Sequence, residues 1–291
     1  MEFNPKELIK SPLNYVGGKY KLLPQILPLF PDNINTFYDV FGGGANVSIN
    51  VKANKIIYND LITELINLLN NLYKTNTEEC LKQIDNTINT YNLTKENKEG
   101  FIKLRNDYNN GNKEWYIFYT LICYCFNNQI RFNNNHEFNS SFGKNRSSFN
   151  LTLRNKFINF VNKLHKLNIN FINKDFKEVI DFSEINKNDF IYLDPPYLVS
   201  CAVYQDGKRG YKGWKSQDNL DLLNLCDKLN SNNIKFALSN VIKSKDKTNE
   251  ILKEWSKQYN IHYINNTYKN CNYHRKANQD NETIEVLVTN Y

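Results

Sequence analysis

Apolar and polar positions change their spacing several times along the chain, and each spacing predicts a different kind of element. Short apolar runs at 36–41 and 55–60 predict two strands, the first ending in glycines and the second in an acid. A short helix is expected between the glycines and Val51. From Leu61 to Tyr73 apolar residues recur every three or four positions, which predicts an amphipathic helix. Helical patterns continue to about Phe126.

Strands and helices alternate again in the second half of the chain, after an irregular segment at 127–150. Alternation of this kind favours a mostly parallel sheet with helices on both faces. We therefore predict an α/β fold in which 1–60 and 166–291 form a discontinuous sheet domain and 61–165 form a mostly helical insertion. The expected elements are helices at 153–167, 218–229 and 246–258, and strands at 169–172, 190–194, 234–240, 262–266 and 283–289.

Residues 127–150, NNQIRFNNNHEFNSSFGKNRSSFN, are polar and basic with interleaved phenylalanines. A loop of this length without regular structure is usually functional or disordered, and its four Phe disfavour full disorder. Those rings could wedge into a partner or only anchor the loop to the helices, and anchoring is the simpler interpretation for most of them. Arg131, Lys144 and Arg146 are suited to contacts with phosphates or base edges.

Bulk composition fits a globular protein and leaves its partner open. Hydrophobic residues make up 41% and charged residues 23% of the 291 residues, which is ordinary for a soluble domain. The formal net charge of +7 permits a polyanionic partner, although simple solubility explains it equally well. The six cysteines form no CxxC pair and the four histidines are scattered, so no metal site is expected.

Neither a membrane span nor an export signal is expected. The first ten residues, MEFNPKELIK, lack the apolar core of a signal peptide. The longest apolar and aromatic run, from Tyr116 to Phe126, is shorter than the roughly 18–20 residues needed to cross a bilayer, so it predicts a buried helix. Isolated cysteines in such a protein are expected to be reduced, and the expected location is the cytoplasm.

The stretch FIYLDPPY begins as a buried strand and stops abruptly at Asp194-Pro195-Pro196-Tyr197. A plain turn explains this ending, because Asp and Pro are good turn residues. A ligand site explains it as well, because open α/β sheets bind ligands at the carboxyl ends of their strands. The prolines leave rigid carbonyls without competing N–H donors. A carboxylate beside such a carbonyl suits an NH₂ group, and a Tyr ring can stack on a base for about 1–3 kcal/mol.

A second candidate stretch, DVFGGGA, places a glycine turn after a strand. Gly42 and Gly43 allow the backbone to turn sharply and to approach a ligand closely. The spacing matches neither GxGxxG nor the phosphate loop, so a pyrophosphate ligand is not indicated. Asp60 follows Asp39 at a spacing that often places an acid on ribose hydroxyls. Capping of the helix that begins near Leu61 explains Asp60 equally well.

Taken in order along the chain, these stretches resemble the Dam-type, alpha-group D12 class of DNA adenine-N6 methyltransferases, whose catalytic motif is the same Asp-Pro-Pro-Tyr after an apolar strand. The resemblance covers nearly the whole chain. The other matching stretches are Tyr15-Val16-Gly17-Gly18-Lys19, Asp39 to Ala45, Asp60, Lys174-Asp175-Phe176, the loop segments Arg131-Phe132-Asn133 and Glu137-Phe138-Asn139, and the ending Glu285 to Tyr291.

The resemblance implies a Rossmann-like methyltransferase sheet that binds S-adenosylmethionine, plus a mostly helical target-recognition insertion. The enzyme would methylate the N6 amine of an adenine flipped out of double-stranded DNA. A separate restriction endonuclease for the same short site is a further implied partner. The implied catalytic residues are Asp194, Pro195, Pro196 and Tyr197. The implied cofactor-binding residues are Tyr15, Lys19, Asp39, Phe41, Gly42, Gly43, Asp60, Asp175, Phe176 and Asp194. The implied DNA-binding residues are Arg131, Asn133, Asn139, Lys144, Arg146 and Arg275.

The sequence departs from the family pattern at several positions. Ala45 replaces the second glycine of the family's F-x-G-x-G turn. Asn14-Tyr15 stands where members that read GATC typically have Lys-Trp, and Asn135 and Ser141 differ from the usual Arg-type and Pro positions of the reading loop. These differences argue against GATC and are closer to members acting on other adenine-containing sites, such as CATG.

Other functions remain open from the sequence. A cytosine-N4 methyltransferase usually carries Ser at the position of Asp194, so the Asp at this position disfavours that function. An inactive DNA-binding relative would need neither the glycine turn nor an intact Asp-Pro-Pro-Tyr. A dehydrogenase would be expected to contain GxGxxG.

Overall fold

The computed structural model describes residues 4–15, 17–199, 213–265 and 283–291, and its centre is a sheet in the order β3-β2-β1-β4-β5-β8-β7. The first five strands of this order run parallel, whereas β8 is antiparallel to both β5 and β7, and the short β6 pairs antiparallel with β5. The strands are β1 (Ile34–Asp39), β2 (Ala53–Asn59), β3 (Ile169–Ile172), β4 (Phe190–Leu193), β5 (Lys235–Ser244), β6 (Lys247–Thr248), β7 (Asn260–Ile264) and β8 (Thr283–Thr289).

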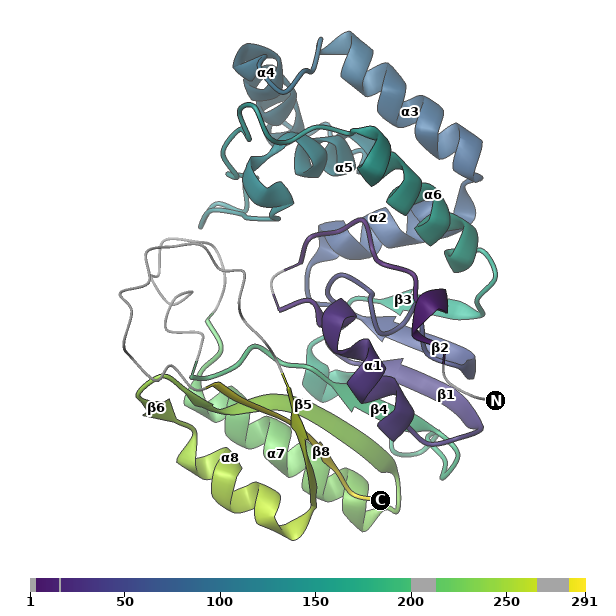
Figure 1. Cartoon of the computed structure of the whole chain (residues 1–291), viewed down its shortest axis with the longest axis vertical. Coiled ribbons are helices and arrows are strands. Elements are labelled where there is room, and N and C mark those ends of the chain that lie inside the picture. Colours follow the sequence, from purple (N-terminus) through teal and green to yellow (C-terminus); the bar gives the residue numbers. More distant parts are fainter. Residues whose placement is uncertain (1–3, 16, 200–212, 266–282) are drawn as a thin grey trace.

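Both faces of the sheet are covered, as predicted (Figure 1). Strand β4 shows why, since all four of its residues are buried and alternate side chains point to opposite faces. Phe190 and Tyr192 join the core under α1 (Leu23–Ile26), while Ile191 and Leu193 join the core under α7 (Ser216–Ser231) and α8 (Glu250–Trp255). The short 3-10 helices are Pro5–Glu7, Lys19–Leu22, Leu27–Leu29, Phe126–Asn128, Phe176–Glu178 and Ser256–Gln258.

Five helices between β2 and β3 form the part of the molecule drawn above the sheet in Figure 1. They are α2 (Thr63–Lys74), α3 (Thr77–Thr90), α4 (Lys98–Asn109), α5 (Trp115–Tyr124) and α6 (Leu151–Leu164). Asn76, Asn97 and Asn150 cap α3, α4 and α6 by accepting a hydrogen bond from a first-turn N–H. Each cap of this kind contributes about 1 kcal/mol, so part of the asparagine bias serves helix starts.

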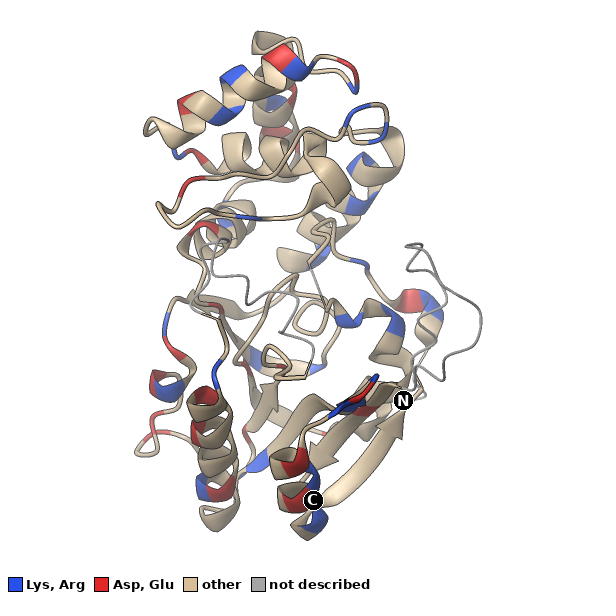
Figure 2. Cartoon of the chain, turned by 90° about the vertical axis from the view of Figure 1, so that its left-hand side faces the viewer, with Lys and Arg blue, Asp and Glu red and all other residues tan. Residues whose placement is uncertain are grey.

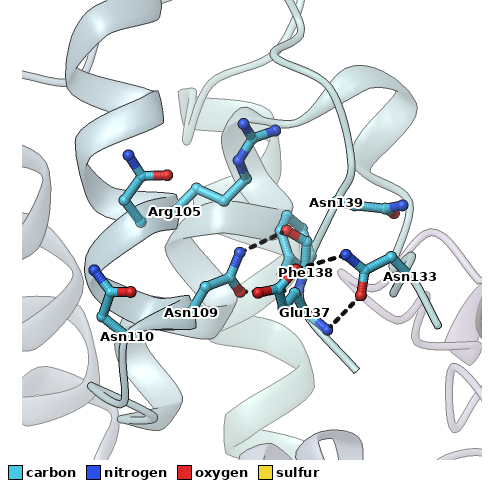
Figure 3. A pocket seen from close by; sticks show the side chains of 8 residues that line it. Arg105, Asn109, Asn110, Asn133, Glu137, Phe138 and Asn139 are labelled. Carbon is cyan, nitrogen blue, oxygen red and sulfur yellow. Dashed lines mark hydrogen bonds between the residues drawn. The ribbon is translucent and has the colours of Figure 1, made fainter. Parts of the chain in front are cut away.

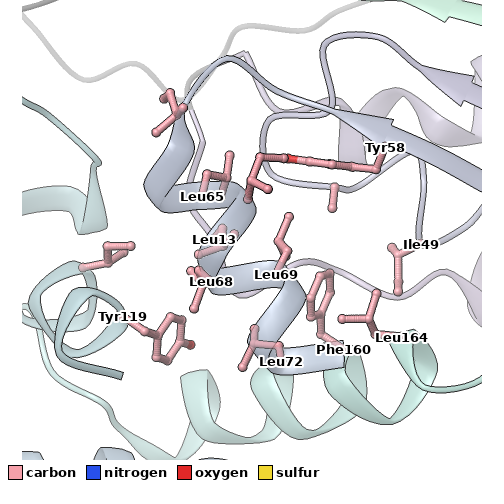
Figure 4. Close-up of a cluster of buried hydrophobic side chains, with 14 of the residues drawn as sticks. Leu13, Ile49, Tyr58, Leu65, Leu68, Leu69, Leu72, Tyr119, Phe160 and Leu164 are labelled. Atoms are coloured by element: carbon pink, nitrogen blue, oxygen red, sulfur yellow. The ribbon is translucent and has the colours of Figure 1, made fainter. Parts of the chain in front are cut away.

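One apolar core runs without a break from the sheet into these helices (Figure 4). Helix α2 lies at the junction, and its Leu65, Leu68, Leu69 and Leu72 are fully buried. The same core contains residues of β2, α5 and α6, among them Tyr58, Tyr119 and Phe160. The predicted spacing of α2 is therefore explained by burial between two layers rather than by one buried face alone.

Two predicted elements differ from the structure. Residues 40–50 form a series of turns rather than a helix, and Ala45 has a left-handed φ of 57°, which interrupts helical geometry. The helix expected at 246–258 begins later than predicted. Lys247–Thr248 forms the short strand β6, which pairs with β5, and α8 begins only at Glu250.

Neither a membrane-spanning helix nor a metal site was expected from the sequence, and the described part of the chain bears on both expectations. None of its helices is long and apolar enough to cross a membrane. Within the same residues, no cluster of His, Cys, Asp or Glu has the arrangement of a metal site.

Candidate active site

Four acids follow four parallel strands at one edge of the sheet. Asp39 is the last residue of β1, Asp60 follows β2 directly, and Asp194 follows β4 directly. Asp175, after β3, accepts a hydrogen bond from the Lys177 N–H at the start of a short 3-10 helix. Because parallel strands place their carboxyl ends together, this edge gathers the predicted acids. The strand order also reverses between β1 and β4, which is where open α/β sheets bind ligands.

The glycine turn fits closely against the end of β2. The Gly42 N–H donates to the Asn59 carbonyl at 2.7 Å, and the Tyr58 hydroxyl donates to the Gly43 carbonyl at 2.6 Å. A Cβ on Gly42 would lie 2.1 Å from a carbon of the Tyr58 ring, so a larger residue does not fit there. Gly43 has a φ of 48°, and the Tyr15 ring lies beside it. Close packing and a left-handed backbone explain these two glycines.

Asp60 holds the turn rather than capping α2. Its two carboxylate oxygens accept hydrogen bonds from the Gly43 N–H at 3.0 Å and the Ile62 N–H at 2.9 Å. Helix α2 starts at Thr63 with Ile62 at the cap position, so the capping interpretation does not apply. Burial raises the pKa of Asp60 to about 6, and the backbone hydrogen bonds oppose this rise.

Asp39 is a buried carboxylate with one oxygen left over. Its Oδ2 accepts a hydrogen bond from the Ser48 hydroxyl at 2.5 Å, whereas its Oδ1 is buried without a hydrogen-bond partner among the described residues. Burial raises the pKa of Asp39 to about 7, and the charges of Asp194 and Asp60 add to this rise. A cationic ligand group would satisfy the unpaired oxygen and offset the repulsion among the three acids.

An aromatic cluster stands beside these acids. Phe41, Phe176 and Trp214 lie with ring centroids 5.4–5.7 Å apart. Phe41 and Phe176 were predicted from their motifs, whereas Trp214 was not, although it lies in a loop whose Gly and aromatic content is evident in the sequence. Asn59 ties the cluster's backbone to the sheet, since its amide group donates to the Val40 and Lys174 carbonyls.

The Asp-Pro-Pro-Tyr segment is held by two other parts of the chain. Lys19 Nζ lies 2.8 Å from Asp194 Oδ1 and 3.8 Å from Glu285 Oε1. The Tyr197 hydroxyl donates to the same Asp194 oxygen at 3.0 Å and to Glu285 Oε1 at 3.2 Å. Lys19 Nζ also lies 4.9 Å from the centre of the Tyr197 ring. The lysine expected on the cofactor side therefore contacts the Asp-Pro-Pro-Tyr segment directly.

Glu285 is the member of this group that sequence reasoning missed as a site residue. It lies in β8, where it is buried among apolar neighbours. The signal was present, because an acid inside the otherwise apolar run at 284–288 needs a buried partner. Burial raises the pKa of the Asp194 carboxyl, Lys19 opposes this rise, and the Glu285 charge adds to it.

Inside 127–150 the chain forms a small hairpin. Phe132 and Phe138 pair across it and are almost fully buried, so for these two rings the anchoring interpretation is confirmed. The Asn109 side chain of α4 donates to the Phe138 carbonyl and accepts from the Phe138 N–H, and thereby fixes the hairpin to the helix. Sequence reasoning missed Asn109 and Arg105, although their spacing of four places them on one helix face.

A polar hollow of about 460 Å³ lies between α4 and the hairpin (Figure 3). Arg105 and Asn109 line it from the helix, and Asn133, Glu137 and Asn139 line it from the hairpin. Asn139 Oδ1 is buried without a hydrogen-bond partner among the described residues. The Asn133 side chain, in contrast, is engaged inside the hairpin turn, where it donates to Glu137 and accepts from two backbone N–H groups.

The expected basic contacts Arg131, Lys144 and Arg146 lie in the insertion. Figure 2 shows Lys and Arg residues on both the helical insertion and the sheet part of the described chain. Lys144 and Arg146 are exposed, and the Arg146 guanidinium lies 4.8 Å from the Phe126 ring centre. Arg131 is half-buried at the base of the hairpin, where its carbonyl accepts from the Asn139 N–H. Arg275 lies outside the described residues.

Comparison with known proteins identifies the family. The family model described as "D12 class N6 adenine-specific DNA methyltransferase" matches residues 15–270, well over half of the chain. The chain belongs to this family. Its members' activity implies a methyl donor and DNA, and the resemblance drawn from the sequence is confirmed.

Curated relatives of this D12 methyltransferase carry names of modification enzymes. It is 49% identical to "Type II methyltransferase M.FokI" of Planomicrobium okeanokoites, over 97% of this chain and 43% of that protein. It is 47% identical to "Modification methylase StsI" of Streptococcus sanguinis, over 98% and 43% of the two chains. It is 35% identical to "Modification methylase LlaI" of Lactococcus lactis subsp. lactis, over 98% and 44%. The chain thus spans less than half the length of these relatives.

Proposed function

We propose that this protein transfers a methyl group from S-adenosylmethionine to the N6 amine of adenine within a short site in double-stranded DNA. The observation that carries the proposal is the placement of Asp194-Pro195-Pro196-Tyr197 at the carboxyl end of β4, at the point where the strand order reverses. A carboxylate and a rigid carbonyl there suit an exocyclic amine, and family membership restricts that amine to adenine.

The edge of the sheet fits this cofactor in charge and in shape. The cofactor has a cationic sulfonium and an ammonium group, and the unpaired Asp39 Oδ1 suits such a cation. Asp60 would face the ribose beside the Gly42-Gly43 turn, with Phe41 and Phe176 beside the adenine ring. Tyr15, Lys19 and Asp175 complete the proposed cofactor surroundings. Bound there, the cofactor supplies an electrophilic methyl group, so the protein needs no covalent intermediate.

Asp194 and the Pro195 carbonyl would orient the target amine. An aromatic amine is a weak nucleophile because its lone pair is delocalised into the ring. If both of its hydrogens are accepted, the nitrogen can become tetrahedral with its lone pair directed at the methyl group. The negative charge of Asp194 also stabilises the positive charge that develops on the amine, which is electrostatic preorganisation. The released proton can leave to solvent.

Tyr197 would hold the flipped base by stacking. Extruding a base costs a few kcal/mol, and stacking on an aromatic ring offsets about 1–3 kcal/mol of this. Pro196 fixes the backbone between the acid and the ring. The Tyr197 hydroxyl donates hydrogen bonds to Asp194 and Glu285, which holds the ring beside Asp194.

The insertion would read the target. Lys144 and Arg146 are exposed and suited to phosphates, and each phosphate contact adds to the salt dependence of binding. Arg131 and Asn139 of the hairpin are suited to base edges, which bidentate contacts discriminate by about 1–3 kcal/mol. Asn133 and Arg275 remain proposed contacts, the former through its role in shaping the hairpin.

A modification role is proposed from the names of the relatives, with a separate restriction endonuclease acting on the same site. DNA as substrate also supports the expected cytoplasmic location. A short adenine-containing sequence other than GATC is the proposed target, because the chain departs from the GATC-reading pattern at Asn14-Tyr15, Asn135 and Ser141.

Sequencing that detects methylated adenine tests the proposal directly. DNA is taken from cells that lack other adenine methylation and express either this protein or its Asp194→Ala variant. We expect adenine methylation at one short sequence with the unchanged protein and none with the variant, while calorimetry shows similar cofactor binding by both. Methylation of cytosine, or full activity of Asp194→Ala, would contradict the proposal.

A further inference from the structure

Three charged side chains, Lys19, Asp194 and Glu285, meet at the Asp-Pro-Pro-Tyr segment, and the charge of Glu285 has no role in the mechanism above. Lys19 is 4% exposed and sits between the carboxylates of Asp194 and Glu285. The Tyr197 hydroxyl bridges the same two carboxylates. Glu285 therefore contacts both groups that contact Asp194, although it comes from the antiparallel strand β8 at a distant position in the chain.

The charges of this group indicate what Glu285 does. A pair made of Lys19 and Asp194 alone would be neutral, and the lysine would weaken the attraction of Asp194 for a developing positive charge. With Glu285 present, the three side chains Lys19, Asp194 and Glu285 carry one positive and two negative charges, which among these described groups is a net charge of −1. That charge can stabilise the amine as it becomes positive during methyl transfer, in a site where burial strengthens electrostatic interactions.

The positions of Asp194 and Glu285 agree with these different roles. Asp194 is the most exposed of the three charged side chains, at 17%, and it is the one that would bind the target amine in the proposed function. Glu285 is buried and shares Lys19 and the Tyr197 hydroxyl with Asp194. When the amine binds to Asp194, Lys19 and the Tyr197 hydroxyl retain a carboxylate partner in Glu285.

We propose that Glu285 is a positioning residue for methyl transfer, which balances the charge of Lys19 and anchors Tyr197 so that Asp194 keeps a net negative charge for the target amine. This inference rests on the proposed function. A purely structural acid would contribute to stability alone, whereas a charge-balancing acid alters the rate of the chemical step.

Glu285→Gln tests the idea, because the amide preserves volume and can still accept a hydrogen bond from Tyr197. With unmethylated DNA that contains the target site and labelled S-adenosylmethionine, we expect kcat to fall by about 10- to 100-fold. This is less than the roughly 10²- to 10³-fold loss for a group that contacts the reacting atoms, because Glu285 acts through Lys19 and Tyr197. KM for DNA and the cofactor Kd should change little. Glu254→Gln, which removes an exposed acid of α8, serves as the control with unchanged kcat.

A double variant distinguishes a loss of charge balance from a general loss of structure at the site. Lys19→Met removes the cation that Glu285 balances, so the double variant Lys19→Met with Glu285→Gln again has a net charge of −1. We expect the double variant to have a higher kcat than Glu285→Gln alone. Equal or lower kcat in the double variant, or a kcat of Glu285→Gln within twofold of the unchanged protein, would overturn the inference.

Urea unfolding of the same four proteins gives a readout that does not need activity. Each single variant removes one member of the buried Lys19–Glu285 pair and leaves the charge of the other in place, which is destabilising, whereas the double variant removes both charges. The stability losses should therefore be less than additive. If the unchanged protein methylates no DNA, the proposed function fails, and the unfolding cycle still decides whether Glu285 balances Lys19; additive losses would refute that pairing.

Discussion

Replacing Asp39 by Asn should stabilise the ligand-free protein at neutral and higher pH while weakening its binding of the methyl donor. Asp39 is buried, one of its oxygens lacks a hydrogen-bond partner within the described part of the chain, and burial raises its pKa to about 7 from the ordinary 3.8. Between these two pH values the folded state holds the proton and the unfolded chain releases it. This group therefore makes folding progressively less favourable as the pH rises from about 4 to about 7.

The pKa difference sets an upper limit on the effect. One pKa unit corresponds to 1.36 kcal/mol, so the complete rise corresponds to about 4 kcal/mol above pH 7. Asn leaves its own polar group facing the unpaired position, and an unpartnered buried polar group costs about 1–3 kcal/mol. We expect a net stabilisation of about 1–3 kcal/mol at pH 8 and a change close to zero at pH 5, where most of the ionisation term is absent.

Urea unfolding at pH 5 and pH 8 measures these differences, with Asp189→Asn as a matched control. Asp189 is also buried at the sheet, but it accepts hydrogen bonds from the Thr36 N–H, the Asn35 amide and the Asn186 N–H. Its replacement should therefore destabilise the protein at both pH values. An Asp39→Asn variant that is no more stable than the unchanged protein at pH 8 would refute the reasoning. Calorimetry should show weaker cofactor binding, by about tenfold or 1.4 kcal/mol.

Two further predictions concern the glycine turn and the hairpin. Gly42→Ala should lower the free energy of unfolding by about 1–3 kcal/mol through overpacking against Tyr58. Gly44→Ala should have a smaller effect in the same urea unfolding assay, because its added Cβ would lie 3.1 Å from the nearest atom, the Tyr15 Cβ. Equal effects of the two variants would contradict the packing argument. Arg131→Ala should relax the target or lose DNA binding without changing cofactor affinity. A phosphate role lowers the slope of log affinity against log salt by about one, whereas a base-reading role affects one position, and unchanged affinity and target would contradict the placement of the reading loop.

The sheet and the position of the acids at its edge could be predicted because their signals are local. Apolar runs bounded by polar residues gave 169–172 and 283–289 with the bounds of β3 and β8. The position of the Asp-Pro-Pro-Tyr segment at the end of a buried strand could be predicted, because the apolar run and the prolines that end it are adjacent in the sequence. The turns at 40–50 were harder, since they depend on the left-handed backbone of Ala45, which no apolar spacing reveals.

The partners of Glu285 and Asn109 could not be predicted because they come from distant segments. Glu285 meets Lys19 only after β8 is inserted beside β5, and the sequence shows no more than an acid in an apolar strand. Asn109 forms a backbone-like pair with Phe138, which depends on how α4 lies against the hairpin. The hairpin's buried rings were predictable in kind, because several aromatics in a polar loop need a surface to pack on.

The unbroken apolar core through α2 limits how this protein can acquire a new target. An insertion that packed on its own could be exchanged between relatives as a module. Here Tyr58 of β2, the leucines of α2 and Phe160 of α6 interlock in one core, and close-packed interiors tolerate few changes of shape. A transplanted insertion would bring mismatched surfaces to that junction and disturb Asp60 just before α2. New specificity is more accessible by substitution of exposed hairpin side chains, one contact at a time, on a frame that stays unchanged.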